Sequence, residues 1–154
     1  MNTIYDFLER DHRRLDDLFA GFRKHKARDP ETALLCFTQF KRGLDRHIRW
    51  EEELLFPPFE NATGMKGYGP TAVMRDEHRQ IHWIVDQIEQ QLLHQVWETD
   101  TLEAQFLEVM GMHNSKEEKI LYPWLDEQLE GPALAEILRQ LEHTAQLTEQ
   151  AAAR

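Results

Sequence analysis

The strongest constraint on the fold is an internal repeat. The segment that begins at residue 77 matches the segment that begins at residue 11. Asp11-His12-Arg13 is matched by Glu77-His78-Arg79, and a His-x-x-x-Glu-Glu motif follows each copy at the same distance. The matched pairs in the two motifs are His47 and His113, Glu51 and Glu117, Glu52 and Glu118, Leu55 and Leu121, Phe56 and Tyr122, and Pro57 and Pro123. A chain of 154 residues with this frame favours one domain built from two similar halves.

Each half has the pattern of a helical hairpin. Gly and Pro are few and gather at the breaks between segments rich in Leu, Glu, Gln and Arg, which are good helix formers. No segment alternates apolar and polar residues as a half-buried strand does. We expect helices at about 3–27, 31–60, 71–97, 101–129 and 132–150.

These ranges predict an all-α fold, an up-down antiparallel four-helix bundle with an additional C-terminal helix. Residues 1–154 then form a single domain, with duplicated hairpins at about 4–60 and 71–127 and a last helix at about 132–150. That last helix could cover the bundle or form a homodimer contact.

Composition excludes several kinds of partner and compartment. With 18 Lys and Arg against 28 Asp and Glu the formal charge is -10, which disfavours nucleic acid and anionic membrane surfaces. No apolar run approaches the roughly 20 residues that span a bilayer. The polar, acidic start of the chain does not resemble a signal peptide, and the single Cys36 fits a reducing compartment. We therefore expect a cytoplasmic protein.

Histidine and glutamate interrupt the apolar faces of the four long predicted helices. Apolar residues recur there at spacings of three and four, and several of the eight histidines fall on the same faces. The residues that this spacing points inward are His12, His47, Glu51, His78, His82, His113 and Glu117. In the fourth helix the spacing also points Ile120 and Trp124 inward. We expect the polar residues to meet in one layer of the bundle.

A bound cation would compensate these inward polar groups. A buried, unpaired carboxylate costs several kcal/mol, and no inward Lys or Arg is predicted. Each half supplies imidazole and carboxylate ligands, a set suited to iron and similar metals, and His and Glu four residues apart share one helix face. Two half-sites suggest two metals about 3.5–4 Å apart, as in other paired sites, with both Glu between them.

The repeat breaks where Asp16 stands at the position that matches His82. One metal would then gain a third imidazole from His82. The other metal, held by His12 and His47, would keep an open coordination position for a small ligand such as O2.

The ordered ligand pattern resembles the hemerythrin family, also called HHE cation-binding domains, over roughly residues 4–127. The resemblance implies a non-haem di-iron centre with an oxo or hydroxo bridge, which binds O2 in carriers, stores or sensors. The ligand sets that it implies are His78, His82 and His113 on one iron, His12 and His47 on the other, and Glu51 and Glu117 as bridges.

The oxygen carriers of this family place an Asp five residues after the last ligand His. Here Glu117 lies four residues and Glu118 five residues after His113, a spacing that is closer to the bacterial and regulatory branch of the family. The resemblance therefore supports metal binding more directly than reversible O2 carriage. We expect Glu117 to be the bridge and Glu118, like Glu52, to face solvent. The residues expected to lie outside the site are His25, His94 and His143 at the surface, and Trp50, Phe56, Tyr122 and Trp124 in core packing.

Two other metal chemistries lack residues that they need. A ferritin-like site requires two Glu-x-x-His pairs, but Arg75 stands where the repeat of Glu9 would be. The His-Glu-x-x-His motif of zinc hydrolases is absent from the segment His78 to His82. The sequence therefore favours a di-iron protein that binds O2 or a related diatomic ligand over an enzyme. The alternatives are a di-iron oxidoreductase that reduces peroxide or NO, and an iron-handling or interaction protein.

Overall fold

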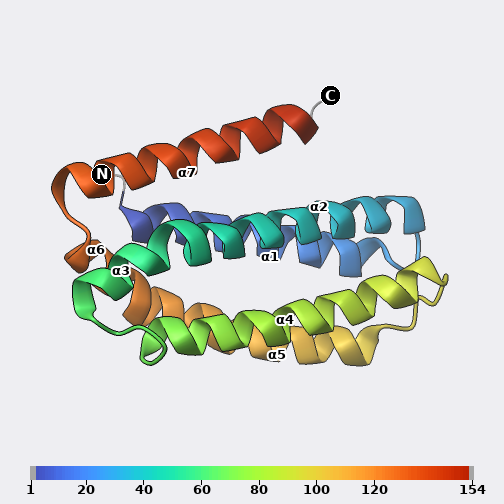
Figure 1. Ribbon diagram of the computed structural model, residues 1–154. Coiled ribbons are helices and arrows are strands. Elements are labelled where there is room, and N and C mark those ends of the chain that lie inside the picture. Colours follow the sequence, from blue (N-terminus) through green and yellow to red (C-terminus); the bar gives the residue numbers. More distant parts are fainter. Residues whose placement is uncertain (1–2, 153–154) are drawn as a thin grey trace.

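The computed structural model describes residues 3–152, which are helical between short connections and include no strand. Four helices run up and down as an antiparallel bundle, and a fifth long helix lies outside it (Figure 1), which confirms the predicted fold class. The bundle helices are α1 (Ile4–His25), α2 (Pro30–Arg49), α4 (Pro70–Leu93) and α5 (Asp100–Lys116).

Local signals explain where the bundle helices begin and end. The Thr3 side chain accepts a hydrogen bond from the Asp6 N–H, and the Asp6 carboxylate accepts one from the Thr3 N–H, which is a capping box for α1. Asp29 caps α2 through the Thr32 N–H, with Pro30 in the first turn. α4 ends before residue 97, the predicted end, because the chain turns at Gln95 with a φ of 60°.

Two π-helical turns divide segments that were expected to be continuous helices. η1 (Trp50–Leu55) joins α2 to α3 (Phe56–Thr63), and η2 (Glu117–Leu121) joins α5 to α6 (Tyr122–Gln128). In each turn the N–H of the aromatic residue donates to the carbonyl five residues back, on Glu51 and Glu117 respectively.

A proline follows each aromatic residue and accounts for the wider turn. The rings of Pro57 and Pro123 would clash with the carbonyl four residues back in a regular α-helix. The added residue in the turn shifts the buried face, so Leu121 and Tyr122 are buried while Ile120 is 58% exposed. The prediction that Ile120 points inward was therefore wrong.

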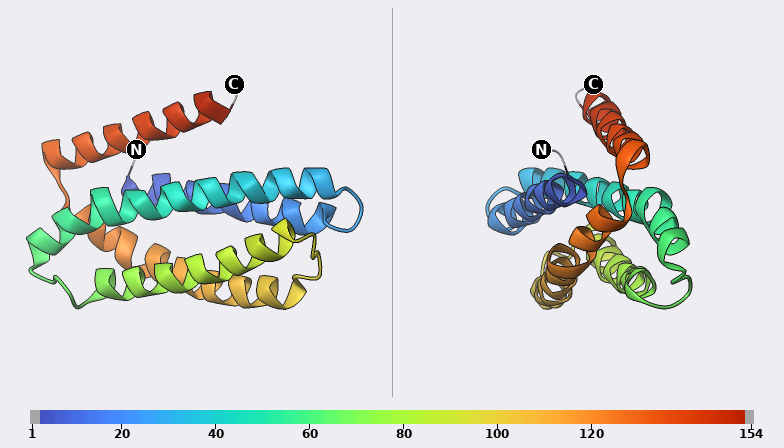
Figure 2. Two further views of the ribbon diagram at one scale, coloured as in Figure 1. Left: turned by 45° about the vertical axis from the view of Figure 1, so that its right-hand side comes forward. Right: turned by 90° about the vertical axis from the view of Figure 1, so that its left-hand side faces the viewer.

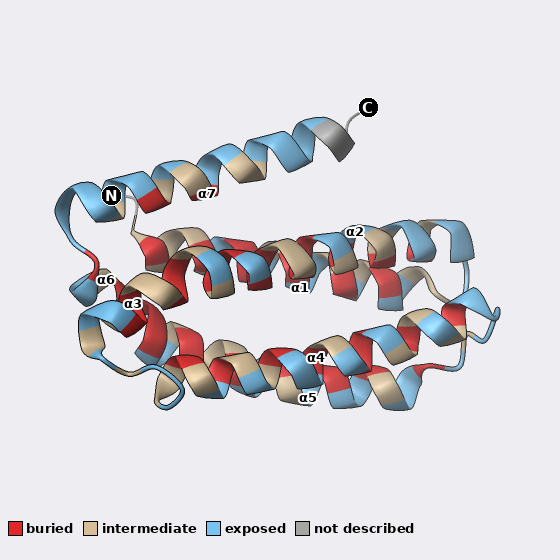
Figure 3. Cartoon of the chain, viewed as in Figure 1, coloured by how far each residue is buried: buried red, intermediate tan, exposed pale blue. Residues whose placement is uncertain are grey.

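Two apolar clusters fill the bundle on either side of the histidine layer. The phenylalanine-rich cluster lies toward the α1–α2 connection and includes Phe19, Phe22, Phe37, Phe40 and Phe106. The capping cluster lies toward α3 and α6 and includes Leu8, Phe59, Leu125, Ile137 and Leu141. The buried residues follow the inner faces of the bundle helices (Figure 3). The histidine layer is therefore held between two packed cores.

α7 (Gly131–Ala152) runs along the outside of the bundle on the side of α1 and α2 (Figure 2). Its Ile137 and Leu141 are buried in the capping cluster, and the Trp50 Nε1–H donates to Thr144 Oγ1 at 2.8 Å. α7 thus covers one end of the bundle, the first of the two roles expected for it. Within residues 3–152, no helix combines the length and the hydropathy needed to cross a membrane.

Candidate metal centre

The structure brings six of the seven predicted ligands into two adjoining clusters. In each cluster one ligand atom from every member lies within 4.8 Å of the others, and all six residues are buried. Both glutamates belong to both clusters, so the clusters share an edge. The members are His12, His47, Glu51 and Glu117 in the first cluster, and His78, His113, Glu51 and Glu117 in the second.

Glu51 links the two hairpins through its two carboxylate oxygens. Its Oε1 lies 2.7 Å from Nε2 of His47, one turn earlier along the same helical segment. Its Oε2 lies 3.0 Å from Nε2 of His78, on α4. Glu51 therefore stands between the first hairpin and the second.

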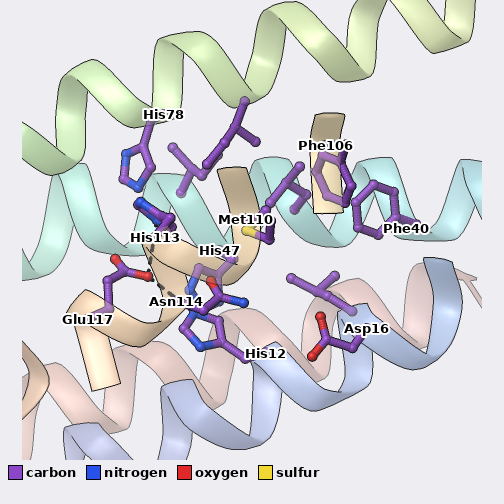
Figure 4. A pocket seen from close by; sticks show the side chains of 14 residues that line it. His12, Asp16, Phe40, His47, His78, Phe106, Met110, His113, Asn114 and Glu117 are labelled. Atoms are coloured by element: carbon purple, nitrogen blue, oxygen red, sulfur yellow. Dashed lines mark ion pairs between the residues drawn. The ribbon is translucent and has the colours of Figure 1, made fainter. Parts of the chain in front are cut away.

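Glu117 makes the matching link from the second hairpin. Its Oε1 lies 3.1 Å from Nε2 of His113, one turn earlier, and 3.2 Å from Nε2 of His12 on α1. All four imidazoles thus direct Nε2 toward the shared carboxylates. Figure 4 shows the four rings and Glu117 converging from different helices.

A second carboxylate holds each imidazole from behind. The Nδ1 contacts are His12 to Glu118 at 2.9 Å, His47 to Asp11 at 2.8 Å, His78 to Glu52 at 2.7 Å and His113 to Glu77 at 2.9 Å. An Nδ1–H that donates to a carboxylate leaves the Nε2 lone pair free for a metal, which is the usual support of a metal-binding histidine. The repeat thus reproduces both the ligands and their supports.

Glu52 and Glu118 had been expected to face solvent, and this prediction was wrong. Their side chains are 31% and 29% exposed, and each reaches a histidine of the other hairpin. They lie in the π-helical turns η1 and η2, directly after the shared glutamates. One helical segment can therefore supply both a shared carboxylate and a support for an imidazole.

Charge in the layer is balanced by protonated imidazole when only protein groups are considered. Burial acts to lower the pKa of His47, but Glu51 and Asp11 outweigh it and raise that pKa to about 10. For His78, burial is likewise outweighed by Glu51 and Glu52, and its pKa rises to about 9. The pKa of Glu51 falls well below its usual value despite burial, because both imidazoles favour the carboxylate. A layer that favours added positive charge so strongly is suited to a cation.

Unpaired polar atoms point to the same conclusion. Glu51 Oε2, His78 Nε2 and Glu117 Oε2 are buried and make no hydrogen bond, although the first two lie only 3.0 Å apart. Such atoms cost free energy unless something binds them. Carboxylate and imidazole donors without thiolate suit iron and similar metals, so these residues fit the metal that the sequence pattern implies.

His82 is the one predicted ligand that the structure brings to neither cluster. Its side chain is 39% exposed, and its Nδ1 lies 3.5 Å from Oδ1 of Asp45. Ile81, which is fully buried, takes the inward position on this turn of α4. Asp16, the repeat partner of His82, is also exposed.

Tyr122 is the residue of the site that the sequence reasoning assigned only to core packing. It is fully buried, and its hydroxyl donates to Glu51 Oε1 at 2.6 Å. The same oxygen lies 3.0 Å from Nε2 of His12 and 3.2 Å from Nε2 of His47. Burial and the two shared glutamates raise the pKa of the phenol well above 10. The available signal was its place in the repeat, where the first half has Phe56.

A small cavity adjoins the clusters on the side of the phenylalanine-rich cluster. Its volume is about 20 Å³, and its apolar wall includes Leu15, Phe40, Ile81 and Phe106. The polar wall is formed by His12, His47, His78, His113 and Glu117, together with Asp16 and Asn114 (Figure 4). This space holds about one water-sized molecule beside the ligand atoms.

The remaining residues singled out in the sequence lie elsewhere. His94 and His143 are exposed and His25 is half-buried, and none of the three belongs to a cluster. Trp50 and Phe56 are buried in the capping cluster, in agreement with the packing role expected of them.

Comparison with known proteins yields one match. The family model described as "Hemerythrin HHE cation binding domain" matches residues 3–125, a range that includes every member of both clusters. No curated protein and no solved structure matches the chain.

Proposed function

The chain belongs to the hemerythrin HHE cation-binding family, and on this premise we propose that its two clusters hold two iron ions and bind O2 or a related diatomic ligand. The protein would then act as a carrier, store or sensor. Iron supplies the redox-active centre to which such ligands bind.

The proposed ligands are the six clustered residues. His12 and His47 would hold one ion, His78 and His113 the other, and Glu51 and Glu117 would bind both. The convergence of the four Nε2 atoms, each with a carboxylate behind its ring, supports this assignment. His82 has no place in the proposed set, because its side chain faces Asp45 at the surface.

The size and lining of the cavity carry the proposal of a diatomic ligand. Pockets that take drug-sized molecules measure about 300–1,000 Å³. The cavity beside the clusters has about 20 Å³, with an apolar wall of Leu, Ile and Phe opposite the ligand atoms, so it excludes all but very small molecules. An apolar wall favours an uncharged ligand such as O2 over a charged one.

A route to this cavity is suggested by a larger groove between α1 and α5. The groove has a volume of about 600 Å³ and shares Asp16, Phe106, Met110 and Asn114 with the wall of the small cavity. These four side chains separate the two spaces. Small movements of them would admit a diatomic ligand from solvent.

The test uses tag-free protein loaded with ferrous iron under argon. We expect the absorption spectrum to change on exposure to O2 and to return when O2 is removed by argon. A protein that binds iron but shows no spectral response to O2 or NO would contradict the diatomic ligand. An irreversible change with continued consumption of O2 or peroxide and an electron donor would identify an oxidoreductase instead.

A further inference from the structure

We propose that Tyr122 is itself a metal ligand, whose phenolate oxygen binds the ion held by His12 and His47. The inference rests on the proposed function, since it assumes that a metal occupies the first cluster. It adds a seventh ligand that the sequence pattern does not include.

The position of the Tyr122 hydroxyl is the first argument. The oxygen lies among all four members of the first cluster. The distances are 2.6 Å to Glu51 Oε1, 3.0 Å to His12 Nε2, 3.1 Å to Glu117 Oε1 and 3.2 Å to His47 Nε2. Neighbouring ligand atoms that each lie about 2.1 Å from one ion are about 3 Å apart, so this oxygen is placed as a further ligand of such an ion would be.

The hydrogen-bond capacity of a phenol is the second argument. The hydroxyl carries one proton and can donate one hydrogen bond. Its neighbours are two carboxylate oxygens and two imidazole nitrogens, whose rings donate their other N–H to Asp11 and Glu118. The two carboxylate oxygens, Glu51 Oε1 and Glu117 Oε1, are both acceptors, and the single phenolic proton can serve only one of them at a time. A cation at this point, bound by the phenolate as well, would satisfy both of them.

Burial makes the arrangement costly without a cation. Tyr122 has no exposed surface, so no solvent reaches the crowded acceptors. A bound cation reverses the local electrostatics, because a ligand beside it loses its proton readily. When the ion enters, an oxygen–metal bond replaces the phenolic O–H bond, and the released proton leaves by the path that admits the ion, so the atoms and charges balance.

The second cluster lacks this oxygen, and the difference assigns the open coordination position. Phe56 stands at the repeat position of Tyr122, and its ring stacks on His78 with the centroids 6.0 Å apart. The His78–His113 ion would then have fewer protein ligands than its neighbour. The open position is therefore expected at that ion, and not at the His12–His47 ion where the sequence pattern alone had placed it.

The experiment compares three forms of the full chain loaded with iron(III). The chain has three tyrosines, and Tyr68 is 62% exposed, so Tyr68→Phe is a matched control for Tyr122→Phe. A phenolate bound to iron(III) gives a charge-transfer band in visible light, with tyrosine ring vibrations enhanced in its resonance Raman spectrum. We expect the band in the wild type and in Tyr68→Phe, and its loss in Tyr122→Phe with about two irons per chain retained.

Four results would overturn the proposal, and they differ in whether they also contradict the proposed function. A wild type that holds two irons without the band, or a Tyr122→Phe variant that keeps the band, excludes the ligand but not the proposed function. A wild type that binds no iron removes both. If Tyr122→Phe does not fold, the resonance Raman spectrum of wild-type protein that contains ring-deuterated tyrosine provides the test. Enhanced bands that do not shift on deuteration do not come from a tyrosine phenolate, and this result would contradict the proposal.

Discussion

The two halves of the metal centre share a scaffold and differ in single side chains. Each half places two imidazoles and a shared glutamate in the layer, and each imidazole has its own carboxylate support. The first half receives the hydroxyl of Tyr122, whereas the second has the ring of Phe56. Duplication thus produces two matching clusters of ligand residues, and one aromatic exchange makes the two clusters chemically unequal.

The largest expected effect comes from removing a carboxylate that both halves share. Glu51→Ala should reduce the metal content from about two ions per chain to less than one, because neither ion keeps its full ligand set. Glu53→Ala is the matched control, since Glu53 is exposed in the same π-helical turn. Elemental analysis after dialysis measures the effect. Two ions retained by Glu51→Ala would show that the halves do not share this ligand.

Variants that each remove one imidazole should separate the halves. His47→Ala and His113→Ala should each lose about one ion, because each residue belongs to one cluster only. The phenolate band should disappear in His47→Ala and persist in His113→Ala. Metal content and the visible spectrum of each variant check this. If both variants lost the band equally, the band would not depend on the His12–His47 ion alone, which would contradict the assignment of Tyr122 to that ion.

Removal of metal from the wild type should lower its stability. Binding to the folded state alone stabilises a protein by about 2.7 kcal/mol when the free metal is at 100 times its dissociation constant. Chelation should therefore lower the melting temperature, and restored iron should recover it. The Glu51→Ala variant serves as the control, because its melting temperature should hardly respond to chelator. An equal response of both proteins would mean that the chelator acts elsewhere.

Removing a supporting carboxylate should have a smaller effect, confined to one half. Asp11→Asn should weaken metal binding about 10- to 100-fold, the usual range for such supports, because Asp11 orients His47. Glu77→Gln should do the same for the other ion through His113. Competition with a coloured chelator gives both affinities. Unchanged affinity in either variant would show that the support of that imidazole is dispensable.

The smallest effect is expected at His82. The two halves differ at this position, where the first half has Asp16, but neither side chain belongs to the two clusters. His82→Ala should keep both ions and the visible spectrum, because the side chain lies outside both clusters. Metal content and the spectrum of the variant test this directly. Loss of one ion would return His82 to the ligand set that the sequence pattern proposes.

The successful sequence predictions depend on features that repeat along the chain. The duplicated frame and its helical spacing predicted the bundle and placed His12, His47, Glu51, His78, His113 and Glu117 in one layer. The family was recognised from the same residues, and the family match over residues 3–125 confirms it. These inferences needed only the register of regular helices.

The unsuccessful predictions arise where the helical register changes or where two residues compete for one face. The π-helical turn before Pro123 moves Tyr122 into the layer and Ile120 out of it, and a regular period of 3.6 residues does not include such a shift. On α4, Ile81 and His82 compete for the inward face, and burial of the apolar side chain is preferred. The spacing of apolar residues alone predicted neither the shift at Ile120 and Tyr122 nor the preference for Ile81 over His82.

The central claim is that one chain holds two ions with six clustered residues, and metal stoichiometry tests it most directly. Tag-free protein would be loaded with ferrous iron under argon, freed of loosely bound metal and analysed for iron per chain. About two irons per chain are expected. One iron or none in the folded protein would contradict it.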